Sequence, residues 1–228
     1  MIQVLSASTT GFHKMPMYNF KELFAARTHC MIFQAQASPC TEESHGWIGG
    51  KAPMFFDDKT ETVNRNGIKH YFYLSLVHPF RPERMISVFI PEEYDEYLEN
   101  NIYPNCSIQV FDHPISKEST SEIYTHPGLI KHSIIGGDLM GDKDSAEQSF
   151  LIKLGGTPGL IQDENYYFTG LAEDGFDFLF QVDEDGYPDT LLDGKFSYPF
   201  SFGAMYVFAQ IISDREFSSP VAGFWQYS

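Results

Sequence analysis

A Gly-Gly segment occurs twice in this chain, and the same order of strand-like segments follows each occurrence. The first copy reads Trp47-Ile48-Gly49-Gly50-Lys51-Ala52-Pro53, and the second reads Lys153-Leu154-Gly155-Gly156-Thr157-Pro158. Apolar, aromatic runs follow at 71–76 and 86–90 after the first copy, and at 176–182 and 205–209 after the second. A unit that recurs in the same order predicts two copies of one supersecondary structure within a single body.

The composition favours sheet over helix. Aromatic residues make up 16% of the 228 residues, and aromatic side chains are enriched in strands. We therefore expect an α+β fold that is predominantly β, with internally duplicated mixed or antiparallel sheets and a few peripheral helices. We expect one compact domain over 1–228, with pseudo-repeats at about 45–112 and 150–212 joined by a loop-rich segment, 113–149, dense in Ser, Gly, Pro and Asp. Helical patterns occur at 17–28 and 91–100, and 81–84 is predicted to be a hairpin connection.

Acidic residues dominate the charge of the chain. Fifteen basic residues stand against 31 acidic ones, which gives a formal net charge of −16. This field repels phosphate backbones and so disfavours nucleic acid as a partner, whereas it attracts a basic protein and accelerates their encounter. A second interpretation stays open, in which the acidity serves only solubility.

The cysteine pattern and the apolar pattern bear on location. Cys30, Cys40 and Cys106 cannot all pair within one chain, and no Cys-x-x-Cys spacing occurs. The first residues lack the basic start and long apolar stretch of a signal peptide, and no apolar run reaches the roughly 18 residues of a membrane span. We expect a cytoplasmic protein with no membrane contact, present as a monomer or weak dimer.

No local motif for catalysis, metal or cofactor binding is present in the sequence. The eight histidines lack ligand spacing, and the acidic groups at 138–144 and 183–186 do not match the twelve-residue calcium loop. A Gly-x-Ser-x-Gly elbow is missing, and the Gly-Gly segments lack the Lys-Ser/Thr of a phosphate loop. We expect no catalytic residue, no metal and no cofactor. An active site assembled from distant residues remains the alternative, because such a site leaves no local trace.

Two stretches of the second copy carry a resemblance to a known family. They are 153–162 (Lys-Leu-Gly-Gly-Thr-Pro-Gly-Leu-Ile-Gln) and 178–183 (Phe-Leu-Phe-Gln-Val-Asp). Both resemble the bacterial YwqG-like family, which is itself of unknown function. The resemblance implies a duplicated, mostly β fold with a cleft between its halves near Gln162, Gln181 and Asp183. It also implies a relation to genes found near toxin clusters.

These observations predict a non-enzymatic protein-binding module. The most specific prediction is an immunity protein that neutralises a bacterial toxin by occluding it. The partner would then be a basic toxin domain. The alternative is a small-ligand-binding protein, or an unrecognised enzyme, that uses the cleft between the repeats. The candidate partner-binding residues are acidic, namely Glu92, Glu93, Asp95, Glu96, Glu99, Asp183, Glu184, Asp185 and Asp189.

Overall fold

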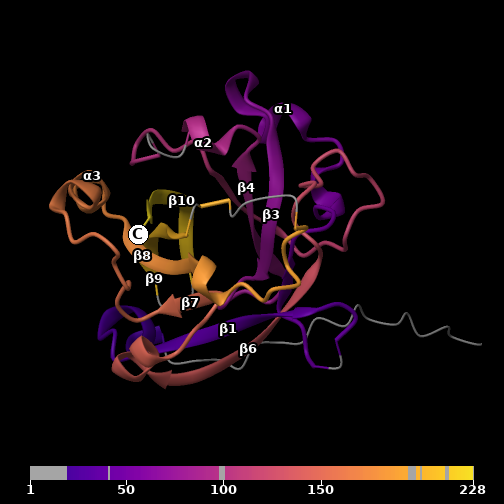
Figure 1. Ribbon diagram of the computed structural model, residues 1–228. Coiled ribbons are helices and arrows are strands. Elements are labelled where there is room, and N and C mark those ends of the chain that lie inside the picture. The colour runs from indigo at the N-terminus through magenta and orange to yellow at the C-terminus, as the bar shows by residue number, and fades with distance from the viewer. Residues whose placement is uncertain are drawn as a thin grey trace, which may run out of the picture.

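A single antiparallel sheet of ten strands forms the body of the protein. We describe it from a computed structural model, over residues 20–40, 42–97, 101–194, 199–200, 202–213 and 216–227. The strands are β1 (His29–Ala37), β2 (Gly46–Ile48), β3 (His70–Val77), β4 (Arg84–Pro91), β5 (Gln109–Pro114), β6 (His132–Gly141), β7 (Ile152–Gly155), β8 (Asp177–Asp183), β9 (Gly203–Ser213) and β10 (Glu216–Tyr227). Their order is β10-β9-β8-β7-β1-β6-β2-β3-β4-β5, and every pairing is antiparallel (Figure 1).

Helical segments are short and peripheral. Three are α-helices: α1 (Thr60–Val63), α2 (Tyr94–Tyr97) and α3 (Thr169–Glu173). The others in the described ranges are short 3-10 or π segments: η1 (Lys21–Ala25), η2 (Met54–Phe56), η3 (Arg65–Gly67), η5 (Asp142–Glu147), η6 (Asn165–Tyr167) and η7 (Glu184–Gly186). The prediction of a mostly β protein with a few helices is therefore confirmed.

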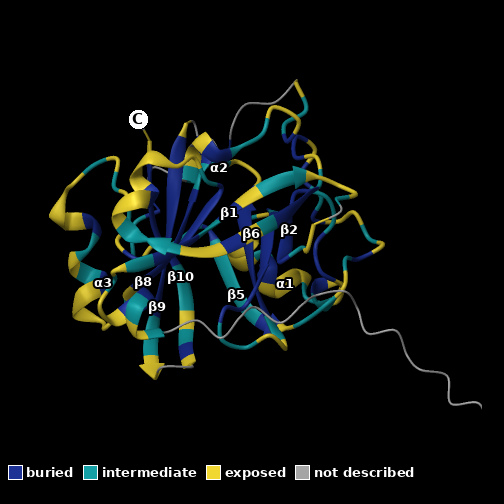
Figure 2. Cartoon of the chain, turned by 90° about the horizontal axis from the view of Figure 1, so that it is seen from below, coloured by how far each residue is buried: buried dark blue, intermediate teal, exposed yellow. Residues whose placement is uncertain are grey.

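The sheet curls until its two ends nearly meet, which gives an almost closed barrel. Just before β5, the backbone N–H of Tyr103 donates to the carbonyl of Gly223 in β10 at 2.7 Å, and the Asn101 side chain donates to the carbonyl of Ala222 at 2.9 Å. These bonds satisfy part of an edge that would otherwise be left unpaired. The buried residues follow the strands, as Figure 2 shows in dark blue.

The strand order is symmetric about the β1–β6 pair. When each of β1–β5 is exchanged with the strand numbered five higher, the series β6-β2-β3-β4-β5 becomes β1-β7-β8-β9-β10, which is the other half of the sheet. The corresponding segments run over 29–114 and 132–227, which is wider than the predicted repeats at 45–112 and 150–212. Duplication of the sequence itself remains a prediction.

Both Gly-Gly pairs have the same backbone conformation. The φ angles are 68° and 70° at Gly49 and Gly50, and 73° and 64° at Gly155 and Gly156. This left-handed region is costly for residues that carry a Cβ, which explains why two glycines stand at the end of each strand. In both halves the chain leaves β2 or β7 through this turn and crosses an outer face of the sheet.

Each crossing segment covers an apolar cluster on the outside of the sheet. In the first half, Phe56 and Val63 pack with Phe72 and Phe89. In the second half, Tyr167 and Leu171 pack with a set of strand residues, Phe178, Tyr206, Phe208 and Phe224. The third cluster fills the barrel interior with residues from both halves. Strands buried on both faces explain why their sequences read as continuous apolar runs rather than alternating ones.

Two sequence predictions need correction. The segment 113–149 is not a loop-rich connection, because it contains β6, which lies at the centre of the sheet between β1 and β2. The prediction was wrong because glycines such as Gly136 and Gly137 are typical of a loop. Both lie within β6, with φ of 92° and 93°, at a register shift in the β1–β6 pair. The helix predicted at 91–100 begins later than expected, because Pro91 still belongs to β4 and α2 starts at Tyr94, while residues 98–100 lie outside the described part. Of the helix predicted at 17–28, the structure describes η1.

Candidate functional site

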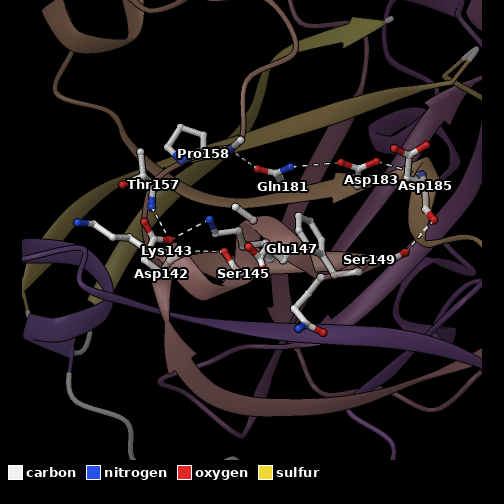
Figure 3. A pocket seen from close by; sticks show the side chains of 15 residues that line it. Asp142, Lys143, Ser145, Glu147, Ser149, Thr157, Pro158, Gln181, Asp183 and Asp185 are labelled. Atoms are coloured by element: carbon white, nitrogen blue, oxygen red, sulfur yellow. Dashed lines mark hydrogen bonds and ion pairs between the residues drawn. The ribbon is translucent and has the colours of Figure 1, made fainter.

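An open pocket of about 650 Å³ lies where the second Gly-Gly turn, η5 and the end of β8 meet. Its volume is within the range of small-molecule sites. Most of the side chains that line it are polar, and Figure 3 shows them on segments from three parts of the chain. The lining includes Asp142, Lys143, Ser145, Glu147, Ser149, Lys153, Thr157, Pro158, Gly159, Gln181, Asp183 and Asp185.

A buried ion pair forms one wall. Lys153 Nζ lies 2.8 Å from Asp142 Oδ1, and the two side chains are only 7% and 15% exposed. The same carboxylate oxygen accepts a hydrogen bond from the backbone N–H of Thr157 at 3.1 Å, just after the Gly-Gly turn. Since both charges are compensated locally, the pair fixes the turn against η5 rather than offering a free charge.

A buried amide forms the floor. Gln181 is 1% exposed, and its Oε1 accepts a hydrogen bond from the backbone N–H of Gly159 at 2.7 Å. Its Nε2 donates to Asp183 Oδ2 at 3.4 Å. Asp183 Oδ1 in turn accepts from the backbone N–H of Asp185 at 3.0 Å. Burial raises the pKa of Asp183, with Asp185 adding to the effect, while the backbone N–H and Gln181 oppose it.

Three carboxylates of the pocket have no ion-pair partner within the described part of the chain. They are Glu147, Asp183 and Asp185. Lys143 lies at the opposite end of the pocket from Asp183 and Asp185 (Figure 3). With Lys153 and Asp142 compensating each other, the end of the pocket at Asp183 and Asp185 attracts cations.

The two halves of the sheet differ in the residues that stand two positions before the Gly-Gly turn and in their partners on the next strand. Lys153 is paired with Gln181 across β7 and β8, two positions before the Gly-Gly turn. At the same distance before the first turn, Trp47 is paired with Ser75 across β2 and β3. All four residues are buried, and burying an amine costs more than burying an indole. The second half thus buries an amine and an amide where the first half buries an indole and a hydroxyl.

Glu184 does not belong to the exposed acidic set in which the sequence placed it. The residue is 3% exposed, and its carboxylate accepts hydrogen bonds from the backbone N–H groups of Phe200, Phe202 and Gly203. Burial raises the pKa of this carboxyl to about 7, although the three N–H groups oppose the shift. Its place beside the pocket is structural: it holds the segment that leads into β9.

The other predicted residues are scattered. Gln162 lies outside the pocket lining and holds β10, since its Nε2 donates to the Tyr227 carbonyl at 3.3 Å. Glu92 is 2.6 Å from Lys69 Nζ, and the hydrogen bond from that amine is the main cause of its lowered pKa. The remaining acidic candidates are exposed where described, namely Glu93, Glu96 and Asp189, while Glu99 and the side chain of Asp95 lie outside the described residues.

A serine and a histidine form a pair in the core, but their burial argues for a structural role. Ser87 Oγ lies 2.7 Å from His113 Nε2, and Ser75 Oγ lies 2.5 Å from Ser87 Oγ. The exposed fractions are 0% for both serines and 1% for the histidine. Burial lowers the pKa of His113 to about 4. A substrate cannot reach this hydroxyl, so the network joins β3, β4 and β5.

Comparison with known proteins gives no relative. No protein-family model matches the chain, and no curated protein matches it closely enough to count as related. No helix within the described ranges is both long and apolar enough to cross a bilayer. The same ranges hold no group of three or more His, Cys, Asp or Glu side chains placed to bind a metal ion.

Sequence reasoning predicted only part of this pocket. It proposed Gln181, Asp183 and Asp185 as site residues, but not Lys153, Asp142 or Glu147. One signal was available for Lys153, which stands between Leu151-Ile152 and Leu154 in an otherwise apolar strand. A charged residue at such a position is either paired or functional. The contribution of η5 had no signal, because its sequence reads as a solvated loop.

Proposed function

We propose that the chain is a non-enzymatic binding protein that engages a basic protein partner, in the manner of an immunity protein that occludes a toxin. The observation that carries this proposal is the cation-attracting end of the pocket, where Glu147, Asp183 and Asp185 have no ion-pair partner within the described ranges. Asp183 and Asp185 are set at the end of a central strand and in the turn after it, so they are held rigidly for recognition.

The net charge of the chain supports the same partner. A charge of −16 raises the rate at which a basic protein arrives, and the carboxylates at the pocket then select its orientation. Many toxins that attack nucleic acids are basic, which is why a toxin domain is the partner we propose. A cytoplasmic location agrees with the three cysteines, all of which are free thiols.

We further propose that the two halves descend from one duplicated unit, as in the YwqG-like family that the sequence resembles. The symmetric strand order and the shared left-handed Gly-Gly turns support this origin. In that history, the polar residues at Lys153 and Gln181 distinguish the copy that binds from the copy that only completes the barrel.

The experiment that tests the proposed function is co-purification of the tagged protein from its own cells, followed by mass spectrometry. We expect one stoichiometric partner with an excess of Lys and Arg. Expressed alone, this partner should stop growth, and co-expression of the present chain should restore it. A chain that purifies alone, or a partner that is harmless by itself, would contradict the immunity role.

Neutralising the pocket acids should slow association with that partner. We expect the triple variant Glu147→Gln, Asp183→Asn, Asp185→Asn to lower kon roughly tenfold at low salt and to weaken its dependence on ionic strength. The matched control, Glu42→Gln, Glu61→Gln, Glu173→Gln, removes the same charge from exposed acids that are not candidate binding residues. Stopped-flow measurements at several salt concentrations compare the two. Equal rates for both triples would show that only net charge matters.

A small polar ligand is the second candidate for this pocket, and its volume of about 650 Å³ is the observation in favour. A thermal-shift screen of polar metabolites tests it. A ligand at about 100 times its Kd should raise Tm by roughly 5 to 10 °C, because it stabilises only the folded state. We expect Asp183→Asn and Gln181→Met each to abolish the shift, whereas Glu61→Gln keeps it. A shift that persists in both pocket variants places the ligand elsewhere.

A further inference from the structure

The buried amine of Lys153 has more hydrogen-bond donors than the described residues have acceptors for it. An ammonium group carries three N–H donors, and this side chain is only 7% exposed. Its partner is Asp142 Oδ1 at 2.8 Å, and that oxygen also accepts from the backbone N–H of Thr157 at 3.1 Å. The pair therefore compensates the charge of Lys153, but it uses only part of the hydrogen-bonding capacity of a group with little contact with solvent.

The amine belongs to the wall of the pocket, so a ligand there can supply the missing acceptor. Lys153 lines the pocket together with Gln181, its neighbour across β7 and β8, which is 1% exposed. A few buried polar groups in the wall of a pocket are what fixes the orientation of a polar ligand. An ammonium group makes its strongest hydrogen bonds to anionic oxygen. Lys153 therefore specifies a carboxylate for one part of the ligand.

The charges at the two ends of the pocket have opposite signs. Lys143 is exposed, and no carboxylate within the described ranges pairs with it. Figure 3 shows Lys143 beside Asp142 and Thr157, at the end of the pocket opposite Asp183 and Asp185. Because the buried ion pair is neutral as a unit, Lys143 leaves this end positive, whereas the two carboxylates make the other end negative.

We propose that the pocket binds a small zwitterion, namely a free amino acid or a short peptide with free termini. The ligand carboxylate accepts from the Lys153 amine and lies near the charge of Lys143, and the ligand ammonium is bound by Asp183 and Asp185. Opposite charges at the two ends fix the direction of the ligand and disfavour molecules that carry only one of the two groups. This inference rests on the second candidate function, a small polar ligand in this pocket, and names the class of that ligand.

A thermal-shift panel tests the class of ligand. The probes are the common L-amino acids, diglycine and triglycine, each at about 10 mM. We expect at least one probe to raise Tm by roughly 5 °C or more. Its decarboxylated amine and its deaminated acid serve as controls, and each should give less than about a quarter of that shift. If no probe raises Tm, or if the amine or the acid alone matches the zwitterion, the inference is overturned.

The outcomes of this panel also separate the inference from the proposed functions. A shift with the amine alone overturns the zwitterion but keeps the cation-attracting end of the pocket. A shift with the acid alone contradicts that end as well. A basic protein that co-purifies while no probe raises Tm overturns the inference and leaves the immunity role standing.

A double variant tests whether Lys153 binds the ligand carboxylate. Lys153→Met with Asp142→Asn removes both charges of the ion pair, and the introduced amide oxygen can still accept from the Thr157 N–H, so the fold is kept. We expect this variant to bind the zwitterion about tenfold more weakly or worse, and the decarboxylated amine within about twofold of wild type. Isothermal titration calorimetry measures both affinities, and circular dichroism checks the fold.

The exposed Lys143 provides a variant that leaves the core unchanged. We expect Lys143→Gln to weaken binding of the zwitterion about two- to threefold, because the charge is exposed to solvent, and to leave binding of the amine unchanged. If the folded double variant binds the zwitterion as tightly as wild type does, or if Lys143→Gln weakens the amine as much as the zwitterion, the assignment of the carboxylate end is wrong.

Discussion

Glu184→Ala should lower the free energy of unfolding by about 3 kcal/mol or more, with a fall in Tm of roughly 10 °C. The variant leaves three backbone N–H groups without an acceptor, on Phe200, Phe202 and Gly203. Phe200 is fully buried, and its ring packs edge-on against Tyr73 at 5.1 Å in the barrel interior. Loss of the carboxylate thus loosens a core contact as well as the turn. Urea unfolding measures the change, and a loss below about 1 kcal/mol would contradict it.

Glu184→Gln serves as the matched variant, and it also isolates a pH effect. Burial raises the pKa of Glu184 to about 7, so the folded state keeps this proton between about pH 4.5 and 7, where the unfolded state has lost it. The contribution of this carboxyl to stability therefore falls as pH rises through that window, by up to about 3 kcal/mol. Glutamine cannot titrate. The difference in the free energy of unfolding between wild type and Glu184→Gln should therefore change by this amount over the same pH range.

Buried histidines change the stability of the fold with pH in the opposite direction. Their contribution must therefore be the same in the two proteins that are compared. Burial lowers the pKa of His78 to about 3 and the pKa values of His113 and His126 to about 4. These groups stabilise the fold above the ordinary histidine pKa, and that stability is lost as pH falls below it. Both wild type and Glu184→Gln contain all three histidines, so their effect cancels in the difference. If the difference in the free energy of unfolding between wild type and Glu184→Gln is constant from pH 5 to pH 8, the three N–H groups keep Glu184 ionised.

Much of the fold follows from local sequence, and the parts that do not follow have identifiable causes. The runs at 71–76, 86–90 and 205–209 lie within strands, and the run at 176–182 is strand from Asp177 onward, because aromatic and β-branched residues buried on both faces leave a clear pattern. Strand β6 was missed because Gly136 and Gly137 read as a loop, whereas they allow a register shift inside a central strand. The order of the strands depends on long-range pairing, which local patterns do not encode.

The site shows the same division between local and long-range information. Sequence could name Gln181 and Asp183 through the family resemblance of 178–183, and the structure places both near the end of the apolar strand β8. Their neighbours Asp142 and Lys153 come from η5 and β7, and only the folded sheet brings them together. The prediction that Glu184 is an exposed acid was wrong. Its sequence context, Asp183-Glu184-Asp185-Gly186, reads as a solvated acidic turn, yet the Glu184 side chain points inward and accepts hydrogen bonds from the backbone N–H groups of Phe200, Phe202 and Gly203.

Gly156→Ala should destabilise the fold strongly by disturbing the wall of the pocket. A Cβ at Gly156 would lie 2.1 Å from Asp142 Oδ1, the oxygen that pairs with Lys153. The carboxylate must move away, which leaves the buried Lys153 amine without its partner. Breaking a buried pair costs about 3 to 5 kcal/mol, and the left-handed φ of 64° adds about 1 to 2 kcal/mol for any residue with a Cβ.

Gly175→Ala separates these two contributions. Gly175 has φ of 73°, close to that of Gly156, but a Cβ there meets nothing within 4 Å. We therefore expect Gly175→Ala to cost only the backbone strain, about 1 to 2 kcal/mol, while Gly156→Ala costs about 4 kcal/mol or more. Adding Lys153→Met should bring the cost of Gly156→Ala close to that of Gly175→Ala, since no buried amine then loses its partner. If Gly156→Ala and Gly175→Ala lower the free energy of unfolding equally, the Lys153–Asp142 ion pair can move without cost. The ion pair would then not fix the wall of the pocket.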